Sequence, residues 1–410
     1  MNQVSLVVVG AGLRGQGYAR RAVSSGGARI VAVAEPDPGR RERFAAEFGV
    51  AQVFEDWTGL AAAGRIADGA IIATPDQQHT GPAIALADLG YHLLAEKPMA
   101  PTEDEAERIV DAVERNKVIF ALCHVLRYTA YTRGLMDVVG SGRIGEIMSI
   151  EHLEPVGWWH QAHSFVRGEW SNSRTSTPML LAKACHDLDW MLYVVGRPVE
   201  RVSSFGRLSH FRPSARPEGA AARCLDCPIE PTCPYSAKRL YFDCLGDPDK
   251  EFWPLSAVTS DHTVDGVTRA LREGPYGRCV YDSDNDVVDH QVVSLEFEGG
   301  ATGSFTMTAF SPFELRKTRL FGTHGYVEGD GVRLRVVDFR DGSETVVETG
   351  GSSVDADHTD GDHALVDTFV EAVATGDPTL LNSDATTSLA GHRVVWAAER
   401  ARAAGTVVTL

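Results

Sequence analysis

The chain has 410 residues, enough for two domains, and its composition is that of an ordinary soluble globular protein. Its formal net charge of −17 argues against nucleic acid and anionic membrane surfaces as partners. We find no apolar run long enough to span a bilayer and no signal peptide, and the seven unevenly spaced cysteines are typical of reduced thiols. We therefore expect a cytoplasmic protein.

The first elements in the chain form a phosphate-binding pattern. An apolar strand at residues 4–9 leads into a glycine-rich turn, a helix follows at residues 16–24, and a second strand at residues 29–34 ends at Glu35. In the turn, Gly10 permits a tight bend, Gly12 lets the backbone approach a pyrophosphate, and Gly15 allows close packing of helix and strand. The helix N-terminus offers N–H groups to phosphates. The pattern predicts a dinucleotide site, the alternative being a glycine-rich turn in an unrelated α/β protein.

Glu35 narrows the choice of cofactor between NAD and NADP. A carboxylate at the end of the second strand accepts hydrogen bonds from ribose hydroxyls and repels a 2′-phosphate, which favours NAD over NADP. The alternative role, a helix-capping acid, suits Asp37 better because Pro38 follows it. Arg40 and Arg41 are near enough in sequence to accommodate a phosphate, so NADP stays open.

Strands and helices continue to alternate up to residue 125. Strands are expected at residues 69–74, 92–95 and 118–122, and helices at residues 81–89 and 102–116. Thr102 is the predicted cap of the second helix, and Glu105 would complete a capping box. Strands separated by helices predict a parallel sheet, covered on both faces, in a Rossmann domain at residues 1–125.

The rest of the chain, residues 126–410, predicts an α+β domain with a large, open, mostly antiparallel sheet. A hairpin with alternating apolar residues is expected around Gly299 and Gly300. Further strands are expected at residues 319–321, 326–328, 332–338 and 345–348, and helices at 131–139, 179–195, 362–375 and 385–403. Residues 210–277 are polar, proline-rich and irregular, and are interpreted as an insertion. The open sheet face predicts a homodimer or homotetramer.

Two segments carry most of the chemistry. Lys97, in Glu96-Lys97-Pro98, follows a strand of the parallel sheet, and ligands bind at the carboxyl ends of such strands. A partly desolvated lysine there can move a proton, the alternative being a solvated loop lysine. In the helix at residues 179–195, one face carries polar residues and the opposite face carries leucines. The polar face is a candidate site, the alternative being a solvated surface. It holds Lys183, His186, Asp187 and Trp190, opposite Leu181, Leu188 and Leu192.

Taken together, these motifs resemble the Gfo/Idh/MocA oxidoreductases over nearly the whole chain. The resemblance rests on residues 10–15, Glu35, the segment from Ala73 to His79, Glu96-Lys97-Pro98, the His186 helix, Asp289-His290-Gln291 and residues 322–325. It implies an NAD(P)-dependent enzyme acting on a sugar, polyol or related cyclic alcohol. It also implies that Lys97 lies beside the reacting carbon and that His186 is the catalytic histidine. The expected cofactor contacts are Gly10, Gly12, Leu13, Arg14, Gly15, Glu35, Thr74, Pro75, His79, Glu96 and Lys97.

One position departs from the family pattern. The family often has an aspartate four residues before the histidine, where this chain has Ala182 followed by Lys183. This resembles a subgroup with Lys-x-x-His and adds a cation, so Lys183 is a further catalytic or substrate-binding candidate. With Arg167 and Arg174 nearby in sequence, an anionic sugar becomes plausible, the alternative being surface salt bridges. The expected substrate contacts are Arg127, Tyr128, Trp159, His160, Arg167, Arg174 and Lys183, with a core role open for the tryptophan.

The insertion contains a cysteine cluster. Cys224 and Cys227 have a zinc-like spacing, and Cys233 and Cys244 follow. Four thiolates could bind a structural zinc ion. The alternative is reduced cysteines that pack an irregular loop.

Three functions remain open on the sequence. A sugar dehydrogenase would use Lys97 and His186 to take the hydroxyl proton as hydride leaves. A redox-cycling glycosidase would oxidise the sugar transiently, eliminate the aglycone, add water and return the hydride, and the cation of Lys183 would help to stabilise an enolate. A non-catalytic NAD-bound scaffold is the third, and the intact Lys97-Pro98 and His186 argue against it.

Overall fold

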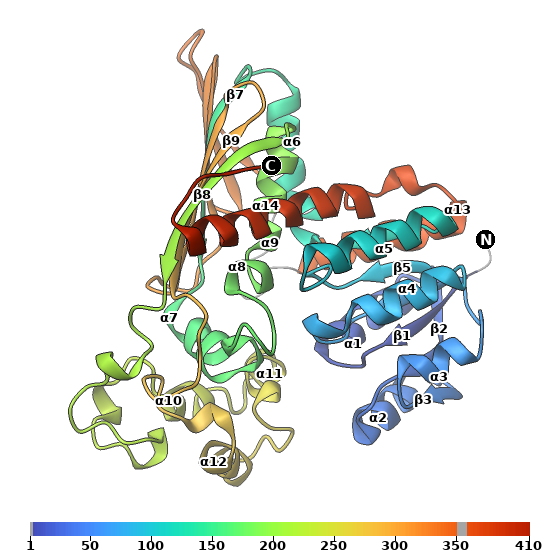
Figure 1. Cartoon of the computed structure of the whole chain (residues 1–410), viewed down its shortest axis with the longest axis vertical. Coiled ribbons are helices and arrows are strands. Elements are labelled where there is room, and N and C mark those ends of the chain that lie inside the picture. Colours follow the sequence, from blue (N-terminus) through green and yellow to red (C-terminus); the bar gives the residue numbers. More distant parts are fainter. Residues whose placement is uncertain (1–2, 351–358) are drawn as a thin grey trace.

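Two sheets organise the chain in the computed structural model, which describes residues 3–350 and 359–410 (Figure 1). The first sheet has six parallel strands in the order β3-β2-β1-β4-β5-β6. This confirms the predicted Rossmann fold. The strands are β1 (Val4–Val9), β2 (Ala28–Ala34), β3 (Gln52–Phe54), β4 (Gly69–Ile72), β5 (His92–Ala95) and β6 (Phe120–Leu122).

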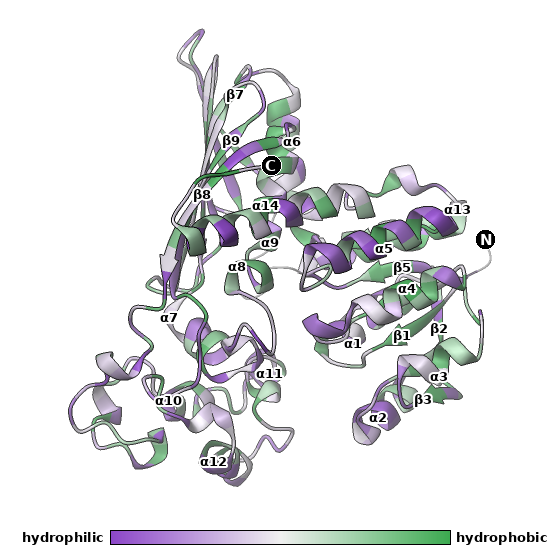
Figure 2. Cartoon of the chain, viewed as in Figure 1, coloured by the Kyte–Doolittle hydropathy of each residue, from purple (hydrophilic) through white to green (hydrophobic). Residues whose placement is uncertain are grey.

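Helices cover both faces of this sheet, so its central strands are apolar throughout, as Figure 2 shows for β1. The helices start where the sequence supplies caps. Asp37 accepts the amide of Arg40, and Thr102 accepts the amide of Glu105. The helices are α1 (Leu13–Ser24), α2 (Pro38–Phe48), α3 (Trp57–Ala62), α4 (Thr80–Asp88) and α5 (Glu103–Asn116).

The second sheet has nine strands in the order β14-β13-β12-β11-β7-β10-β9-β8-β15. Every neighbouring pair is antiparallel except β7 and β10, which run parallel, so the predicted mostly antiparallel sheet is confirmed. The predicted turn at Gly299 and Gly300 joins β9 to β10, and both glycines have positive φ. The strands are β7 (Ile147–Pro155), β8 (Val199–Arg207), β9 (His290–Phe297), β10 (Thr302–Thr308), β11 (Lys317–Gly322), β12 (Gly325–Gly329), β13 (Arg333–Asp338), β14 (Glu344–Glu348) and β15 (Val408–Thr409).

The sequence did not predict β7, although it lies in the middle of the second sheet. Its inward-facing positions alternate as a strand should, but two of the three are the polar residues His152 and Glu154, after Ile150. Polar residues at inward positions hide the apolar alternation by which strands are found. These two buried side chains belong to the site described below.

The C-terminal helices join the two sheets. In α13 (Thr359–Thr375), Leu365 and Phe369 pack into the same apolar cluster as Val4 and Leu6 of β1. The last long helix, α14 (Ala385–Ala404), begins against the Rossmann core and continues along the second sheet (Figure 1). The Rossmann core is therefore completed by residues from the far end of the chain.

The predicted single helix at residues 179–195 is two helices. It breaks into α8 (Met179–Ala182) and α9 (Cys185–Val195) at Lys183 and Ala184. Ala184 has φ −106° and ψ 12°, which is not helical backbone. Helix α6 (Ala130–Gly140) packs nearby, in the same apolar cluster as α9 and the second sheet.

Residues 210–277 form a separate lobe of short helices and turns (Figure 1). Its helices are α10 (Ala237–Phe242), α11 (Pro248–Phe252) and α12 (Val264–Glu273). They enclose a small apolar cluster that includes Tyr241, Leu255 and Leu271. A segment of π-helix, Gln161–Arg167, follows the one-turn helix α7 (Trp158–His160) and packs against this lobe through Ala162 and Val166.

Candidate active site

The glycine turn has the geometry that a dinucleotide pyrophosphate requires. A Cβ at Gly10, whose φ is 93°, would lie 2.5 Å from the carbonyl oxygen of Ala73, and a Cβ at Gly15 would lie 2.0 Å from that of Gly10. At Gly12 a Cβ would meet nothing within 4 Å among the described residues. Two glycines are thus sterically required and the third leaves open space at the N-terminus of α1, which no described side chain caps. The residues present fit a bound pyrophosphate.

Glu35 lies buried at the end of β2, beside this turn. Its Oε2 accepts the amide of Ala11 at 2.8 Å, and its Oε1 accepts the amide of Asp37 at 2.9 Å and the guanidinium of Arg40. Arg41 donates to the carbonyl oxygen of Glu35 at 2.6 Å. Both arginines considered for a phosphate are therefore engaged by Glu35. The carboxylate faces the glycine turn, where a ribose would be held.

Arg14 and Glu96 contact each other. Glu96 is buried, and its Oε1 accepts the Nε of Arg14 and, at 2.7 Å, the hydroxyl of Tyr18. Burial acts to raise the pKa of Glu96, but Arg14 and Lys97 outweigh it and lower the pKa to about 2. Oε2 accepts the amide of Lys97 at 2.7 Å. This network positions the backbone of Lys97, and Arg14 also bonds Asp362 of α13.

The loop after β4 is tied to the loop after β5 by His79. Its imidazole lies between the carbonyl oxygens of Pro98, at 2.6 Å, and Thr74, at 2.7 Å. His79 is 1% exposed, so the ring acts as a brace between the two loops. The family resemblance assigns Thr74, Pro75 and His79 to the nicotinamide side, and the brace holds this loop next to the segment that carries Lys97.

Three candidate catalytic residues gather where α8 ends and α9 begins. The Nζ of Lys97, from the Rossmann domain, donates to the carbonyl oxygen of Ala182, the last residue of α8. Lys183 is the next residue, and its Nζ lies 3.3 Å from Oε1 of Glu154 on β7. His186 is in the first turn of α9 and is 5% exposed. The helix break therefore brings two lysines and an imidazole together from both domains.

A buried histidine layer lies behind His186. The ring of His124 is 5.7 Å from that of His186 and 5.4 Å from that of His392. Burial, with the charges of Arg127 and Lys97, holds the pKa of His124 well below its usual value. Burial lowers the pKa of His392 to about 3, and its Nε2 accepts the amide of Met99 at 3.0 Å. Both rings are therefore neutral at physiological pH.

Arg127 and Tyr128, two of the expected substrate contacts, form hydrogen bonds with other residues of the protein. Arg127 forms a bidentate ion pair with Asp189, at 2.7 Å from Nε and 2.7 Å from Nη2, and is 3% exposed. The hydroxyl of Tyr128 bonds Ser383 at 3.0 Å and accepts the amide of Asn382 at 2.9 Å. The two residues hold α9 and the start of α14 in place beneath the site, and these contacts give them a positioning role.

The polar stripe predicted on one helix face is not a single exposed surface. Asp187 is fully buried and bonds Arg316 at 2.6 Å and His152 at 3.1 Å. Burial acts to raise the pKa of Asp187, but Arg316 and His152 hold it below its usual value. Trp190 is 1% exposed and donates to Thr132. Of the stripe, Lys183 and His186 lie closest in sequence to Ala182, the residue that Lys97 contacts.

Sequence reasoning missed Glu154. It pairs with both Lys183 and Arg316, the latter at 2.9 Å, and is 3% exposed. Glu154 supplies a carboxylate beside Lys183 in a site where Ala182 replaces the family aspartate. Recognition of β7 would have supplied the signal, since an acidic residue at an inward position of a strand is rarely buried without a function or a partner.

A second contact between the domains closes one side of the site. Asp76, in the loop after β4, accepts the hydroxyls of Ser176 at 2.9 Å and Thr177 at 3.2 Å. Gln77 donates to the carbonyl oxygen of Ser176. Arg174 lies on this same connecting segment and is exposed, with its Nε 3.4 Å from Oδ1 of Asn172. Arg174, one of the two arginines proposed for an anionic substrate, therefore lies beside the contact between the two domains.

Arg167 is not beside the site. It is 4% exposed and donates to the carbonyl oxygens of Arg278 and Tyr235, each at 2.8 Å, inside the lobe. The expectation that it binds substrate is therefore corrected. Trp159 and His160 also face the lobe, because their rings pack against Trp253, at 5.2 and 5.1 Å between centroids.

The four cysteines proposed for zinc do not form one group. Cys244 belongs to the apolar cluster of the lobe and donates to the carbonyl oxygen of Leu240 at 3.1 Å, apart from Cys227 and Cys233. No three cysteine, histidine or acidic side chains within residues 3–350 and 359–410 converge as they stand on a point that would hold an ion. The predicted zinc site formed by these four cysteines is therefore not supported.

Comparisons with known families match both domains. A family model described as an oxidoreductase family with an NAD-binding Rossmann fold matches residues 4–124, and the model of its C-terminal alpha/beta domain matches residues 137–410. In the described ranges, no helix is both long and apolar enough to cross a membrane.

Individual relatives are distant. The protein YteT of Bacillus subtilis (strain 168) is 24% identical over 63% of this chain and 59% of its own length. The 2,7-anhydro-N-acetylneuraminate hydratase of Mediterraneibacter gnavus is 28% identical over 50% of this chain and 53% of its own length. The chain thus spans little more than half the length of these relatives.

Solved structures share the fold over the whole chain. An oxidoreductase from Agrobacterium radiobacter in complex with NAD+, L-tartaric acid and magnesium has a TM-score of 0.73 at 16% identity and covers 100% of this chain and 98% of its own. A scyllo-inositol dehydrogenase from Lactobacillus casei with bound NAD(H) and scyllo-inositol has a TM-score of 0.69 at 16% identity and covers 100% of this chain and 99% of its own.

Proposed function

The chain belongs to the Gfo/Idh/MocA family of oxidoreductases, and from this premise we propose that it is an NAD-dependent enzyme that transfers a hydride from a sugar or sugar derivative. One observation carries the proposal. Lys97 reaches from the Rossmann domain to the carbonyl oxygen of Ala182, next to Lys183 and His186. The proposal is supported because lysine and histidine can transfer protons, and Lys97 follows the carboxyl end of a strand in the sheet that also carries the glycine turn.

Bound NAD+ supplies the hydride acceptor. The chain's own residues then have separate tasks. The N-terminus of α1 and Glu35 bind the pyrophosphate and ribose. Lys97 and His186 lie where a substrate hydroxyl would lose its proton, and His186 is the proton acceptor in the proposal. Lys183, with Glu154 as its counter-charge, binds or polarises the substrate.

Lys183 and Arg174 also support an anionic substrate, such as a sugar with a carboxylate, phosphate or sulfonate group. Lys183 is 13% exposed at its side chain and Arg174 is exposed, so both can contact a ligand. The comparison to make is between a neutral sugar and its uronate. If the uronate has no advantage in kcat/KM, the anionic preference is wrong.

The alternative function is a redox-neutral glycoside-cleaving enzyme. One relative is named a hydratase of an anhydro sugar rather than a dehydrogenase. The second lysine beside His186 favours the same chemistry, since an extra cation stabilises an enolate formed next to the transient ketone. In this reaction the hydride returns to the product, and NAD is regenerated.

One experiment separates the two functions. The protein is incubated with NAD+ and a panel of free sugars and aryl glycosides, while NADH absorbance and aglycone release are followed together. Stoichiometric NADH supports the dehydrogenase. Aglycone released without net NADH, and lost in Lys97→Ala, supports the glycosidase. If neither product appears with any substrate while NAD binds, the catalytic proposal fails in favour of a scaffold.

We also propose a homodimer or homotetramer assembled through the second sheet. Phe205 on β8 is 71% exposed and lies directly opposite Val292 on β9, which is 39% exposed. Apolar cross-strand pairs on an open sheet face are typical of subunit contacts. Light scattering that shows a monomer at micromolar concentration, or a Phe205→Glu variant with an unchanged mass, would contradict this proposal.

A further inference from the structure

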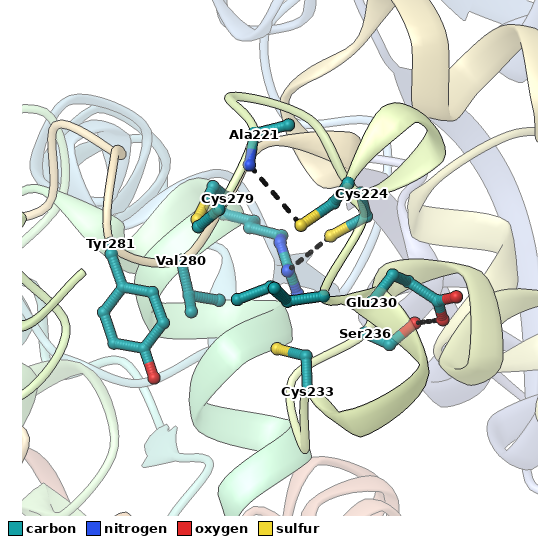
Figure 3. A pocket seen from close by; sticks show the side chains of 12 residues that line it. Ala221, Cys224, Glu230, Cys233, Ser236, Cys279, Val280 and Tyr281 are labelled. Carbon is teal, nitrogen blue, oxygen red and sulfur yellow. Dashed lines mark hydrogen bonds between the residues drawn. The ribbon is translucent and has the colours of Figure 1, made fainter. Parts of the chain in front are cut away.

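Four cysteines surround one pocket in the lobe, but they are not the four that the sequence suggested. Cys224, Cys227 and Cys233 line this pocket together with Cys279, which lies outside the lobe's predicted range. Figure 3 shows labelled Cys224, Cys233 and Cys279 around the same space, close to Val280. The pocket is therefore lined by four thiols from two segments of the chain.

The backbone holds these thiols together. Arg223 and Arg278 form an isolated antiparallel bridge, and the amide of Cys279 donates to the carbonyl oxygen of Ala222 at 2.8 Å. Cys224 and Cys279 each directly follow a residue of this bridge, so the two segments meet at the pocket. The Cys224–Cys227 turn closes with an amide-to-carbonyl bond of 3.4 Å. Such a turn presents both of its sulfurs to one side.

N–H groups point at the sulfurs. The amide of Ala221 donates to Sγ of Cys227 at 3.4 Å, and Nη2 of Arg167 donates to Sγ of Cys224 at 3.5 Å (Figure 3). Hydrogen bonds to sulfur stabilise the thiolate, which is the form that binds metals. Sulfurs that accept such bonds in a buried pocket are typical of metal-bound thiolates.

The pocket also contains a buried cation that forms no ion pair among the described residues. Arg167 is 4% exposed, and it donates to two carbonyl oxygens and a sulfur. Its Nη1 has no hydrogen-bond partner among the residues that the structure describes. A buried guanidinium is expensive unless negative charge faces it. Four neutral thiols supply none, whereas four thiolates around a divalent centre carry a net charge of about −2.

We propose that Cys224, Cys227, Cys233 and Cys279 ligate a metal centre through four thiolates, with Arg167 as its buried counter-charge. The centre fastens the lobe to the segment Gln161–Arg167, which follows β7 of the second sheet in the chain. Its role is structural, because the pocket lies apart from Lys97 and His186. The ligand set excludes Cys244.

Two kinds of centre use four thiolates. A single zinc ion requires the sulfurs to converge at about 2.3 Å from one point, whereas an iron–sulfur cluster takes ligands that stand farther apart around it. In the described chain the thiols line the pocket without converging on one point. Formation of a zinc site therefore requires the cysteine side chains to rotate. An iron–sulfur cluster, whose ligands stand farther apart, requires less rotation. The experiment distinguishes the two by composition.

The test is elemental analysis of the full-length protein, purified without chelators or a metal-affinity tag. About one zinc per chain identifies the single ion. Iron with acid-labile sulfide in equal amount and a broad absorbance near 400 nm identifies a cluster. Less than about 0.2 metal per chain in protein prepared both aerobically and anaerobically overturns the proposal.

Two variants test the ligand set. Cys279→Ser should lose the metal, and Cys244→Ser, the same change at a buried thiol in the neighbouring cluster, should keep it. The opposite pattern would show that the assignment is wrong. Circular dichroism and NAD binding, which depends on the other domain, show whether Cys279→Ser is folded.

If Cys279→Ser is insoluble, the proposal is tested on the wild-type protein instead. Titration with a mercurial reagent should release the metal in step with the reaction of about four thiols, and the metal-depleted protein should unfold at a lower temperature. Thiols that react with no metal release, or a Cys224–Cys227 disulfide found by mass spectrometry in freshly isolated protein, would overturn the proposal.

Discussion

Lys183 and Glu154 form an ion pair between the α8–α9 break and the central strand β7, with 3.3 Å between Nζ and Oε1. Glu154 is also 2.9 Å from Nη2 of Arg316, so one carboxylate faces two cations. The family aspartate is absent at Ala182, and this acid arrives instead from a strand that is distant in sequence. The pair determines how Lys183 is presented to a substrate.

Replacing Lys183 by alanine should raise KM more than it lowers kcat. Lys183 is held by Glu154 and is interpreted as a substrate-binding cation, which acts equally on the ground and transition states. Steady-state kinetics on the substrate found by the screen is the measurement. An unchanged KM with a collapsed kcat would instead make Lys183 the catalytic acid or base.

Glu154→Gln should destabilise the fold, because it removes the carboxylate that faces Lys183 and one of the two that face Arg316. The loss of one partner of a buried pair is expected to cost about 3–5 kcal/mol. Adding Lys183→Met should recover part of this loss, since it removes the cation that has lost its carboxylate. Urea unfolding of both single variants and the double variant measures the coupling. Strict additivity would mean that the pair does not interact energetically.

Lys97→Ala and His186→Ala should affect chemistry and leave NAD binding intact. Lys97 donates to Ala182 beside the site, so its loss should abolish hydride transfer. His186→Ala should lower kcat by about two to four powers of ten, the usual contribution of general acid–base catalysis. NAD binding by calorimetry is the control for folding. A His186→Ala variant with wild-type kcat would remove His186 from the proton step.

The protein should bind NAD more tightly than NADP. Glu35 faces the glycine turn and engages Arg40 and Arg41, which are then less available to a 2′-phosphate. Glu35→Ala should weaken NAD binding and reduce the difference in affinity between NAD and NADP. Titration of wild type and variant with both cofactors is the measurement. Equal affinities in the wild-type protein would refute the interpretation of Glu35.

Stability should fall as the pH is lowered through the range below about 6.5, the ordinary histidine pKa. The pKa of His392 is lowered to about 3 in the folded protein, so the unfolded chain binds its proton first. The contribution of His392 is complete above about pH 6.5 and is lost toward pH 3, with a slope of about 1.4 kcal/mol per pH unit. His392→Gln should flatten this dependence between pH 6 and about 5, where carboxylates still stay ionised. Parallel curves for variant and wild type would contradict the assignment.

The sequence determined those parts of the protein that depend on local signals. The glycine turn, Glu35, the capping residue Thr102 and the turn at Gly299 and Gly300 are each defined by neighbours within a few residues, and the structure has them as predicted. The same holds for the Rossmann strands other than β3, because a parallel strand covered on both faces is largely apolar. The sequence did not predict β3, which is three residues long and exposed at Gln52 and Val53.

Only the tertiary structure decided which distant residues meet. Glu154 reaches Lys183, Cys279 joins Cys224, and Arg167 enters the lobe instead of the substrate site, and each contact depends on how strands and loops far apart in sequence are brought together. Helical periodicity also did not reveal the break at Lys183 and Ala184, or that Asp187 and Trp190 are buried against Arg316 and Thr132. Buried charged groups and thiols pair with residues that are distant in sequence. The pattern of a single segment therefore does not identify their partners.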